Sequence, residues 1–582
     1  MTDSARSLGY RLRALLGEIY PELDVDILAS MVLDAFWPED TTRRKRGRVA
    51  GNTLWSEQDA LLITYGNSIV DGAHKPLDLL NDFLHRYLRG ILNSVHILPF
   101  FPYTSDDGFA VSDFRAVNPQ LGDWPDINRI AADFTLMSDL VLNHVSSQGN
   151  WFNAYRQGQP PFDTFFFEAA PQDDLRDVVR PRTTPLLQEV ETPNGPRHVW
   201  CTFSHDQVDL DFRNPEVLLE FLRIIRLHVD NGVQIIRLDA VAFLWKQIGT
   251  PSIHLPQTHA IVRLMRLLCD YAPEKIILLT ETNVPKAENL SYFGAGDEAH
   301  AIYNFPLPPL ILHAMMSGNG AHLRRWQRTM PPAPMGCAYL NFTASHDGIG
   351  MRPAEGLLPE DEKQQVIDTV LQVGGLVSMR SLPDGGQSPY ELNTTFYDAL
   401  SRTFKGEDDH HHARFICSQT IVMSLEGIPA FYIHAMLATP NDHAQVEHRG
   451  MSRAINRHRW DYPTLRDRLA DGASAQARVL GDLSARLKVR QEQKAFHPNA
   501  TQFTVNLQDD RVFGVWRQSL DRKQSIFALH NVSDASVAIS AAALNLIEDQ
   551  PWLDLISGEP IATSADHITL EPYQCMWITN RF

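Results

Sequence analysis

From Leu61 to Asp347, short apolar runs alternate with amphipathic stretches, and this alternation restricts the fold more than any other feature of the chain. Short runs rich in β-branched residues are typical of buried strands, and the amphipathic stretches between them are typical of helices. Strands that alternate with helices form βαβ units around a parallel sheet. The sequence therefore predicts an α/β fold. The expected strands are LLITY, SVHILPFF, MSDLVLN, VQIIRLDAV, KIILLTETN and AYLNFTASHD.

Each of these runs ends in polar or aromatic residues that are capable of chemistry. A (β/α)8 barrel builds its active site from the C-terminal ends of successive strands. The sequence therefore predicts a (β/α)8 TIM barrel whose site lies at that rim. The residues at the ends of the runs are Tyr65, Phe100 with Asp106 just beyond it, Asp139 with Asn143 and His144, Arg237 with Asp239, Glu281, and His346 with Asp347.

The run VQIIRLDAVAF carries two charges, Arg237 and Asp239, near its end. Residues two apart on a strand point to the same face of the sheet. A buried charge is tolerated only when it is paired or functional. We therefore expect both side chains at the mouth of the barrel.

The remaining segments differ from the alternating region and predict further domains. Residues 1–55 space their apolar residues at three and four, which predicts a helical N-terminal extension. The barrel is expected over 56–494, interrupted at 146–212 and 348–405 by long segments that are typical of lids or inserted subdomains. Residues 495–582 alternate apolar and polar residues over many short runs, which predicts an antiparallel β domain.

Composition argues against several classes of partner. The chain has 52 Lys+Arg against 70 Asp+Glu, a net charge of −18, which disfavours nucleic acid and anionic membranes. The basic run RRKRGR at 43–48 is interpreted as a solvated helix end. No export signal and no apolar run of about 18 residues occurs, so a cytoplasmic protein without a membrane span is expected.

Metal-binding and disulfide patterns are also lacking in the sequence. The five cysteines are far apart and form no CxxC pair, so neither a disulfide framework nor a structural zinc site is indicated. The run His410–His412 is not expected to bind a metal, because adjacent histidines suit no single face of a helix or strand.

Four short regions, DLVLNH, IIRLDAV, LLTETN and FTASHD, follow one another at the predicted strand ends. In this order they resemble the defining regions of the α-amylase superfamily, glycoside hydrolase family 13. The resemblance implies that Asp239 is a nucleophile and Glu281 a general acid/base. It also implies that Asp347 holds the hydroxyls of the sugar and stabilises the transition state.

The chemistry of that family requires these residue types. Cleavage of an α-glucosidic bond with retention needs one carboxylate to attack the anomeric carbon and a protonated one, about 5 to 5.5 Å away, to protonate the leaving oxygen. Arg237 would keep Asp239 ionised, because a nearby cation lowers the pKa of a carboxyl. Crowding by Asp239 and Asp347 would raise the pKa of Glu281.

Longer stretches from about Leu61 to His458 resemble the sucrose phosphorylase subgroup: VHILPFFPYTSDDGFAVSDFRAVNPQLGDW, LWKQIGTPSIHL, YNFPLPPLILHA, SHDGIGMRP and GMSRAINRH. Members use phosphate in place of water and release glucose 1-phosphate. The residues implied to hold the donor glucose are Tyr65, Asp106, His144, Arg237, His346 and Arg453. Those implied to face phosphate or the acceptor are Arg182, Phe243, Asn283, Arg380, Gln387, Tyr390 and Glu391.

Arg182 suits phosphate because a guanidinium fork binds oxyanions well. The acceptor is less constrained. Here the loop GGQSPYELN replaces the Leu-Asp-Leu-Tyr-Gln run typical of sucrose phosphorylases, and it resembles phosphorylases of glucosylglycerol or glucosylglycerate, as do the helical extension and FHPN. A glycerate carboxylate would need a cation such as Arg380, whereas Gln387 is neutral. The sequence thus favours glycerol, with glycerate or fructose as alternatives.

Two other functions remain open at this point. A hydrolase or transglucosidase would use the same three carboxylates with water or a sugar hydroxyl as acceptor. A barrel that only binds is disfavoured, because all three carboxylates are present. The expected partners are small molecules: an α-glucoside, inorganic phosphate, and glycerol or glycerate.

Asn143 matches a position that often binds calcium in amylases. The phosphorylases of the subgroup generally do without calcium, and no Asp-rich loop occurs in this sequence. We therefore expect neither a metal nor another cofactor.

Overall fold

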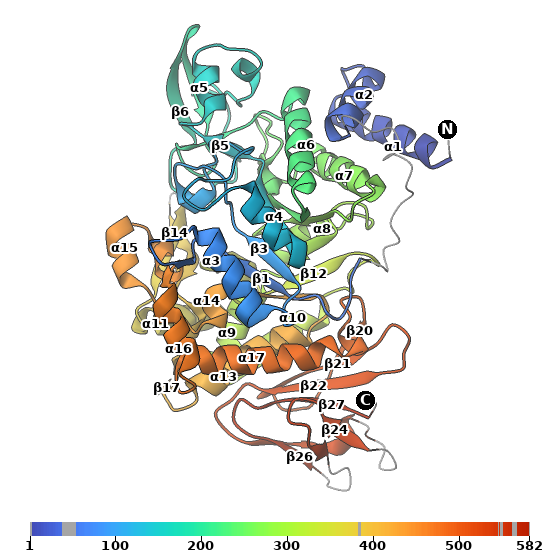
Figure 1. Cartoon of the computed structure of the whole chain (residues 1–582), viewed down its shortest axis with the longest axis vertical. Helices are drawn as coiled ribbons and strands as arrows, with labels where there is room; N and C mark the ends of the chain where they lie inside the picture. Colours follow the sequence, from blue (N-terminus) through green and yellow to red (C-terminus); the bar gives the residue numbers. More distant parts are fainter. Residues whose placement is uncertain are drawn as a thin grey trace.

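Figure 1 shows the chain as a computed structural model. The basic run 43–48 and Gly385 of the GGQSPYELN loop lie outside the residues that it describes. The described residues are 3–37, 54–381, 386–544, 546, 551–561 and 567–580.

Eight parallel strands close into a barrel, in the order β1, β18, β12, β11, β10, β9, β4, β3. This confirms the predicted (β/α)8 fold. Six of the strands lie in the six predicted runs; β11 and β18 were not predicted. The barrel strands are β1 (Leu61–Thr64), β3 (Ser94–Ile97), β4 (Thr135–Val141), β9 (Val233–Asp239), β10 (Ile277–Thr280), β11 (Ala301–Tyr303), β12 (Ala338–Asn341) and β18 (Ile428–Tyr432).

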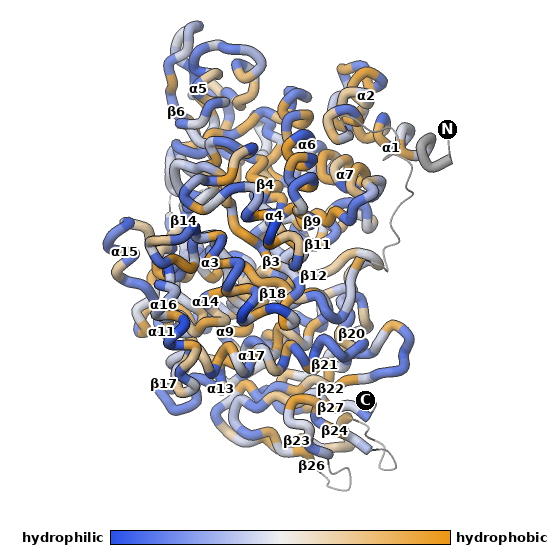
Figure 2. Tube along the Cα trace, viewed as in Figure 1, coloured by the Kyte–Doolittle hydropathy of each residue, from blue (hydrophilic) through white to orange (hydrophobic). Residues whose placement is uncertain are grey.

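Helices follow the strands and cover the outside of the barrel (Figure 1). Local sequence starts several of them: Asp123 and Asp126 form a capping box at α4, and Asn214 caps α6 ahead of a proline. Apolar stretches gather among the central strands (Figure 2). The helices around the barrel include α3 (Pro76–Phe83), α4 (Trp124–Asp133), α6 (Pro215–Asp230), α7 (Pro256–Tyr271), α8 (Lys286–Ser291), α9 (Leu307–Ser317), α10 (Ala321–Arg328), α13 (His411–Ser424), α14 (Ile433–Met436), α16 (Tyr462–Ala470) and α17 (Ala475–Gln491).

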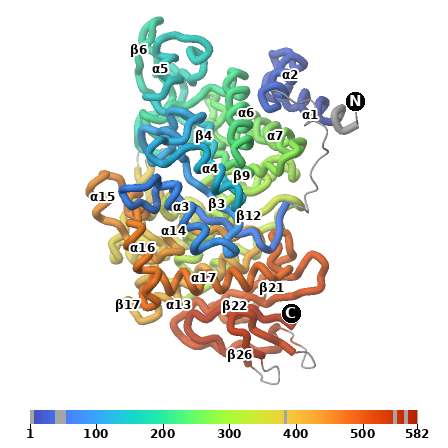
Figure 3. Tube along the Cα trace, viewed as in Figure 1, coloured from blue at the N-terminus to red at the C-terminus, as the bar shows by residue number. Residues whose placement is uncertain are grey.

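The N-terminal segment forms two helices, α1 (Asp3–Ile19) and α2 (Val25–Phe36). They pack against α7 and α6 on the side of the barrel (Figure 3). Tyr20 follows α1, and its hydroxyl donates to the backbone oxygen of Phe212, 2.9 Å away. The pair is thus attached directly to the barrel layer.

Two insertions follow strands β4 and β12. The first contains a short pair, β5 with β8, and a hairpin, β6 with β7; the second contains an antiparallel sheet in the order β13, β15, β14. Their elements are β5 (His144–Ser146), α5 (Asn150–Arg156), β6 (Leu187–Thr192), β7 (Gly195–Trp200), β8 (Gln207–Asp209), β13 (Ile349–Gly350), η7 (Arg352–Ala354), α11 (Glu360–Gln372), β14 (Leu376–Ser381), β15 (Gln387–Asn393) and α12 (Phe396–Ala399).

The C-terminal strands form an antiparallel sheet in the order β20, β21, β22, β27, β24, β25, with a separate pair β23 and β26. They lie at the end of the molecule opposite the N-terminal helices (Figure 3). This confirms the predicted antiparallel β domain. The strands are β20 (Thr501–Thr504), β21 (Val512–Gln518), β22 (Ser525–Asn531), β23 (Val537–Ser540), β24 (Trp552–Asp554), β25 (Pro560–Ile561), β26 (His567–Leu570) and β27 (Cys575–Thr579).

Among the residues that the structure describes, no helix combines the length and the apolar character needed to cross a membrane. The five cysteines all belong to this described part; each is buried and none forms a disulfide.

Candidate active site

One pocket lies at the C-terminal ends of the barrel strands, where the sequence places the site. It collects side chains from the barrel, from both insertions and from the segment after β18. Of the residues expected to act there, those that line it are Asp106, His144, Arg182, Asp239, Phe243, Glu281, Asn283, His346, Asp347, Tyr390 and Arg453.

Arg237 lies beneath the pocket rather than in its wall. It is 2% exposed, and its Nη1 donates to Asp239 Oδ1 at 2.6 Å and to the carboxylate of Asp139. His96 contacts the other oxygen of Asp139 at 2.6 Å. The arginine on β9 is therefore held between two carboxylates, and it fixes the position of Asp239.

Asp239 and Glu281 are both buried carboxyl groups. Burial raises the pKa of Asp239, and Arg237 opposes this rise. Burial is also the largest cause of the raised pKa of Glu281, with Asp347 as a second cause, whereas the sequence analysis named only crowding. The arginine contacts Asp239 directly, so we assign the charge to Asp239 and the proton to Glu281.

Asp347 is a partly buried carboxyl group, but arginine side chains close to it lower its pKa instead of leaving it raised. Arg453 Nη1 lies 2.6 Å and Arg457 Nη2 3.9 Å from its Oδ1. Burial raises the pKa of this carboxyl, but the guanidinium groups of Arg453 and Arg457 outweigh it, so the pKa is held below its ordinary value. Asp347 therefore stays ionised under ordinary conditions.

Arg453 is itself held by Glu391. Its Nε and Nη2 donate to the two carboxylate oxygens of Glu391, both at 2.9 Å. Glu391 is 2% exposed and lies outside the pocket wall. A Cβ at Gly348 would lie 2.5 Å from Glu391 Cγ, so the chain has no room there for a larger residue. The predicted acceptor residue Glu391 instead supports Arg453.

The predicted donor-site residue His346 lies between two aromatic rings. Phe109, which was not predicted, stacks on its ring at 4.9 Å between centroids, and the predicted Tyr65 meets it edge-on at 6.0 Å, outside the pocket wall. Burial lowers the pKa of His346 to about 3, so the ring is neutral. His144 Nε2 donates to the backbone oxygen of Phe109, 2.9 Å away.

Asp106 adopts a left-handed backbone conformation, with φ of 51°. Asp107 follows at φ 49° and contacts Arg457 Nη1 at 2.6 Å. Left-handed backbone is uncommon outside glycine and is tolerated best by Asp and Asn. The turn places Asp106 in the pocket wall, 3.7 Å from the same guanidinium nitrogen.

Both insertions contribute to one side of the pocket, here called the insertion side: Arg182, Phe203, Arg352 and Tyr390. The Arg182 guanidinium lies over the ring of Tyr390 at 5.3 Å and that of Phe203 at 6.0 Å. Neither Arg182 nor Arg352 forms an ion pair with any carboxylate of the described residues. These two are therefore available to an anion.

Two expected acceptor residues lie elsewhere. Arg380 Nη2 pairs with Glu355 at 2.7 Å, and its Nε donates to Ser388 at 3.0 Å. Gln387 is exposed on β15. Neither lines the pocket, because the hairpin of β14 and β15 carries them away from it.

Several residues of the site were not predicted from the sequence. Arg352 lies in the quoted motif SHDGIGMRP and Arg457 in GMSRAINRH, four residues after Arg453, so both signals were present. Phe203 and Gln207 come from an insertion without a recognisable pattern, and only the fold brings them to the pocket.

At the position where amylases often bind calcium, the chain supplies its own cation. Lys246 Nζ lies 2.9 Å from Asn143 Oδ1, 2.9 Å from the backbone oxygen of Phe243 and 3.0 Å from Asp209 Oδ2. Lys246, Asn143 and Asp209 are all buried. An ammonium surrounded by oxygens satisfies the same ligands that a calcium ion would use.

This arrangement predicts a large stability effect for Lys246→Met, because the variant leaves the carboxylate of Asp209 buried without its cation. We expect a loss of about 3–5 kcal/mol in the free energy of unfolding, measured by urea denaturation. Lys405→Met is the matched control. Lys405 lies 2.8 Å from its partner Asp534, but the lysine is 70% exposed and the aspartate 34%, so the loss of this pair should cost at most about 1 kcal/mol. Equal effects would contradict the assignment.

Comparisons with known proteins agree with this geometry. The family described as "Alpha amylase, catalytic domain" matches residues 85–335. The chain is 45% identical over 526 residues to a glucosylglycerate phosphorylase of Allomeiothermus silvanus, covering 90% of this chain and 91% of that protein. It is 30% identical over 424 residues to a glucosylglycerol phosphorylase of Marinobacter adhaerens, covering 70% and 83%.

A solved structure supports the fold over nearly the whole chain. The sucrose 6F-phosphate phosphorylase from Thermoanaerobacter thermosaccharolyticum superposes with a TM-score of 0.73 at 23% identity. The match covers 89% of this chain and 99% of that one. The barrel, the three carboxylates at its mouth and the sequence relatives lead to one classification: the chain belongs to the α-amylase family, glycoside hydrolase family 13, and within it to the glucosyl phosphorylases.

Proposed function

We propose that this phosphorylase acts on glucosylglycerate, releasing α-glucose 1-phosphate and glycerate in a reversible reaction. The sequence analysis favoured glycerol as the acceptor. The relatives favour glycerate, because identity to the glucosylglycerate phosphorylase is 45%, against 30% to the glucosylglycerol phosphorylase.

The preference for glycerol rested on Arg380 and Gln387, and neither residue lines the pocket. Arg380 is paired with Glu355, and Gln387 is exposed on β15. The acidic Glu391 of the same strand also lies outside the pocket wall, and Arg453 neutralises it through two hydrogen bonds.

The observation that carries the proposal is the pair Arg182 and Arg352 on the insertion side. In a two-step phosphorylase, the leaving acceptor and the incoming phosphate occupy the same part of the pocket in turn. Glycerate and phosphate are both anions, so two guanidinium groups in the wall of the pocket suit both half-reactions. Glycerol would leave these partly buried cations without a charge partner in one half-reaction, which is costly.

The mechanism then assigns one task to each carboxyl group. Glu281 protonates the oxygen that leaves with glycerate, while Asp239 attacks the anomeric carbon and forms a covalent glucosyl-enzyme. A phosphate oxygen then attacks the same carbon, and Glu281 takes up the proton that phosphate releases. Two inversions at this carbon give net retention. Asp347, fixed by Arg453, would bind the sugar hydroxyls.

A donor panel tests the proposed substrate. Glucosylglycerate, glucosylglycerol and sucrose would be supplied with and without phosphate, and glucose 1-phosphate measured. We expect product only with phosphate, and a kcat/KM for glucosylglycerate at least tenfold above that for glucosylglycerol, about 1.4 kcal/mol in transition-state free energy. Sugar release at the same rate without phosphate would instead identify a hydrolase.

A variant of Arg352 tests whether this residue causes the preference for glucosylglycerate. Arg352→Ala should reduce the preference for glucosylglycerate over glucosylglycerol by about tenfold, since it removes a charge partner of the carboxylate. Arg380→Ala is the matched control from the same insertion, and its ratio should stay within twofold of wild type because Arg380 is occupied by Glu355. The reverse pattern, with Arg380→Ala alone erasing the preference, would restore Arg380 as the carboxylate partner.

Arg182 is expected to serve phosphate in particular, because it lies over the ring of Tyr390 and is free of ion pairs with described carboxylates. Arg182→Ala should raise the KM for phosphate at least tenfold while lowering the kcat/KM for slow hydrolysis of the same donor much less. This split indicates loss of a ligand-specific contact. Equal losses in both reactions would show that Arg182 only shapes the pocket.

The pKa directions predict the pH profile. Glu281 must be protonated to act as the acid, so its raised pKa extends activity upward from the ordinary value of 4.5, and kcat/KM should fall as pH rises through the raised pKa. Asp347 stays ionised to low pH because its pKa is lowered. With α-glucosyl fluoride, whose leaving group needs little protonation, the alkaline decline should be absent from kcat/KM.

Glu281→Gln is the control for that assignment. Its kcat/KM for glucosylglycerate should fall by at least a hundredfold, which is in the range of general acid catalysis, whereas that for α-glucosyl fluoride should fall far less. An alkaline decline that persists in Glu281→Gln would belong to another group.

A further inference from the structure

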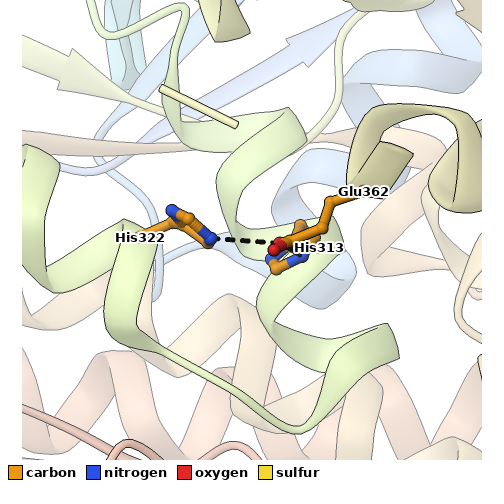
Figure 4. Close-up of side chains that lie close together, drawn as sticks. All are labelled: His313, His322 and Glu362. Atoms are coloured by element: carbon orange, nitrogen blue, oxygen red, sulfur yellow. Dashed lines mark ion pairs between the residues drawn. The ribbon is translucent and has the colours of Figure 1, made fainter. Parts of the chain in front are cut away.

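Three potential metal ligands meet at a junction of helices outside the catalytic pocket (Figure 4). His313 lies on α9, His322 on α10 and Glu362 on α11. None of the three lines the pocket at the barrel mouth. The proposed catalytic mechanism uses none of them.

The ligand atoms of these side chains are close to one another. Glu362 Oε2 lies 2.6 Å from His313 Nε2 and 3.0 Å from His322 Nε2, and all three atoms lie within 4.8 Å of each other. Figure 4 shows the two rings on neighbouring helices with the carboxylate between them. The two imidazole rings are 5.3 Å apart and nearly perpendicular.

Hydrogen bonding alone does not satisfy the buried member of this group. His313 is 2% exposed, and neither of its ring nitrogens makes a well-formed hydrogen bond with a described residue. Its Nε2 is close to Glu362, but the direction of approach is unsuitable for a hydrogen bond. A buried polar atom without a hydrogen bond destabilises the folded state. A metal ion bound between His313 and its neighbours would give the His313 nitrogen a partner.

We propose that His313, His322 and Glu362 bind one divalent transition-metal ion of the zinc class. Two imidazole nitrogens and one carboxylate oxygen are ligands that Zn²⁺ prefers, in a set that leaves a fourth position for water. The carboxylate is 31% exposed, so water can reach that position. The sequence analysis predicts no metal, and the proposal departs from it at a site that no local sequence motif reveals.

The separations of the ligand atoms fit such an ion after a small adjustment. With bonds of about 2.0 to 2.2 Å in a tetrahedral site, ligand atoms lie roughly 3.3 Å apart. The two contacts of Glu362 must therefore lengthen by less than about 1 Å. The two histidine nitrogens lie at most 4.8 Å apart and must come to the same separation. Rotation of the glutamate side chain can supply its part of the change, because that side chain is 31% exposed.

The position indicates a structural role for the ion. Glu362 belongs to α11, which lies in the chain between η7, carrying Arg352, and the hairpin of β14 and β15, carrying Tyr390. The backbone N–H of Met351 donates to the oxygen of Tyr390 at 2.9 Å, which joins these two parts. An ion bound by α9, α10 and α11 would fasten the second insertion to the barrel helices.

Metal titration of the full-length, untagged chain tests the proposal. The protein would be treated with a chelator, dialysed, and titrated with Zn²⁺ by isothermal calorimetry, and with Co²⁺ by visible absorption. We expect one Zn²⁺ per chain and the ligand-field bands of tetrahedral Co²⁺. Zn²⁺ should also raise the unfolding temperature of wild type, because it binds only the folded state.

Two variants locate the ion. His322→Ala and Glu362→Gln should each weaken Zn²⁺ binding at least tenfold and abolish the rise in unfolding temperature. His85→Ala is the matched control, because His85 pairs with Asp133 at 2.9 Å on the surface but belongs to no three-ligand group among the residues that the structure describes. It should bind as wild type does. Glu362→Gln keeps the shape of the side chain and so separates metal binding from a packing defect.

Other outcomes would overturn the proposal. If the wild-type protein does not bind one ion per chain, the proposal is wrong, and the three side chains are only a carboxylate shared by two histidines. Full binding by His322→Ala and Glu362→Gln would place the ion elsewhere, for example at His410–His412.

Discussion

The site depends on the buried contact of Arg237 with Asp139 and Asp239. A guanidinium in the middle of the barrel would be costly without these carboxylates, and each carboxylate would be costly without it. Because all three side chains project from adjacent strands β4 and β9, the barrel itself sets their separation. The two strands thus determine the position of Asp239, the proposed nucleophile, and Arg237 on the same strand keeps it charged.

The second insertion fixes the positions of side chains in the other half of the pocket. Tyr390 and Glu391 are neighbours on β15, so they point to opposite faces of the strand. Tyr390 lines the pocket under Arg182. Glu391 forms an ion pair with Arg453, which in turn contacts Asp347. A shift of this strand would therefore disturb both the insertion side, where the acceptor is proposed to bind, and Asp347, which is proposed to bind the sugar.

The sequence was sufficient for features that depend on strand ends. Asp239, Glu281 and Asp347 could be placed together because each follows an apolar run, and parallel strands bring their C-terminal ends to one rim. The strand β11, only three residues long, gave too weak a pattern to recognise. Arg352 and Arg380 are equally basic in sequence, and only the fold shows that Glu355 occupies one of them. Lys246 likewise becomes meaningful only beside Asn143 and Asp209.

In the proposed reaction, a glucosyl group passes through Asp239 to phosphate with two inversions at the anomeric carbon. The most direct test is the anomeric configuration of the first glucose 1-phosphate formed from the α-linked donor, followed by proton NMR in the presence of phosphate. Two inversions predict the α anomer from the earliest time points. Formation of the β anomer would mean a single inversion and would contradict a covalent intermediate on Asp239.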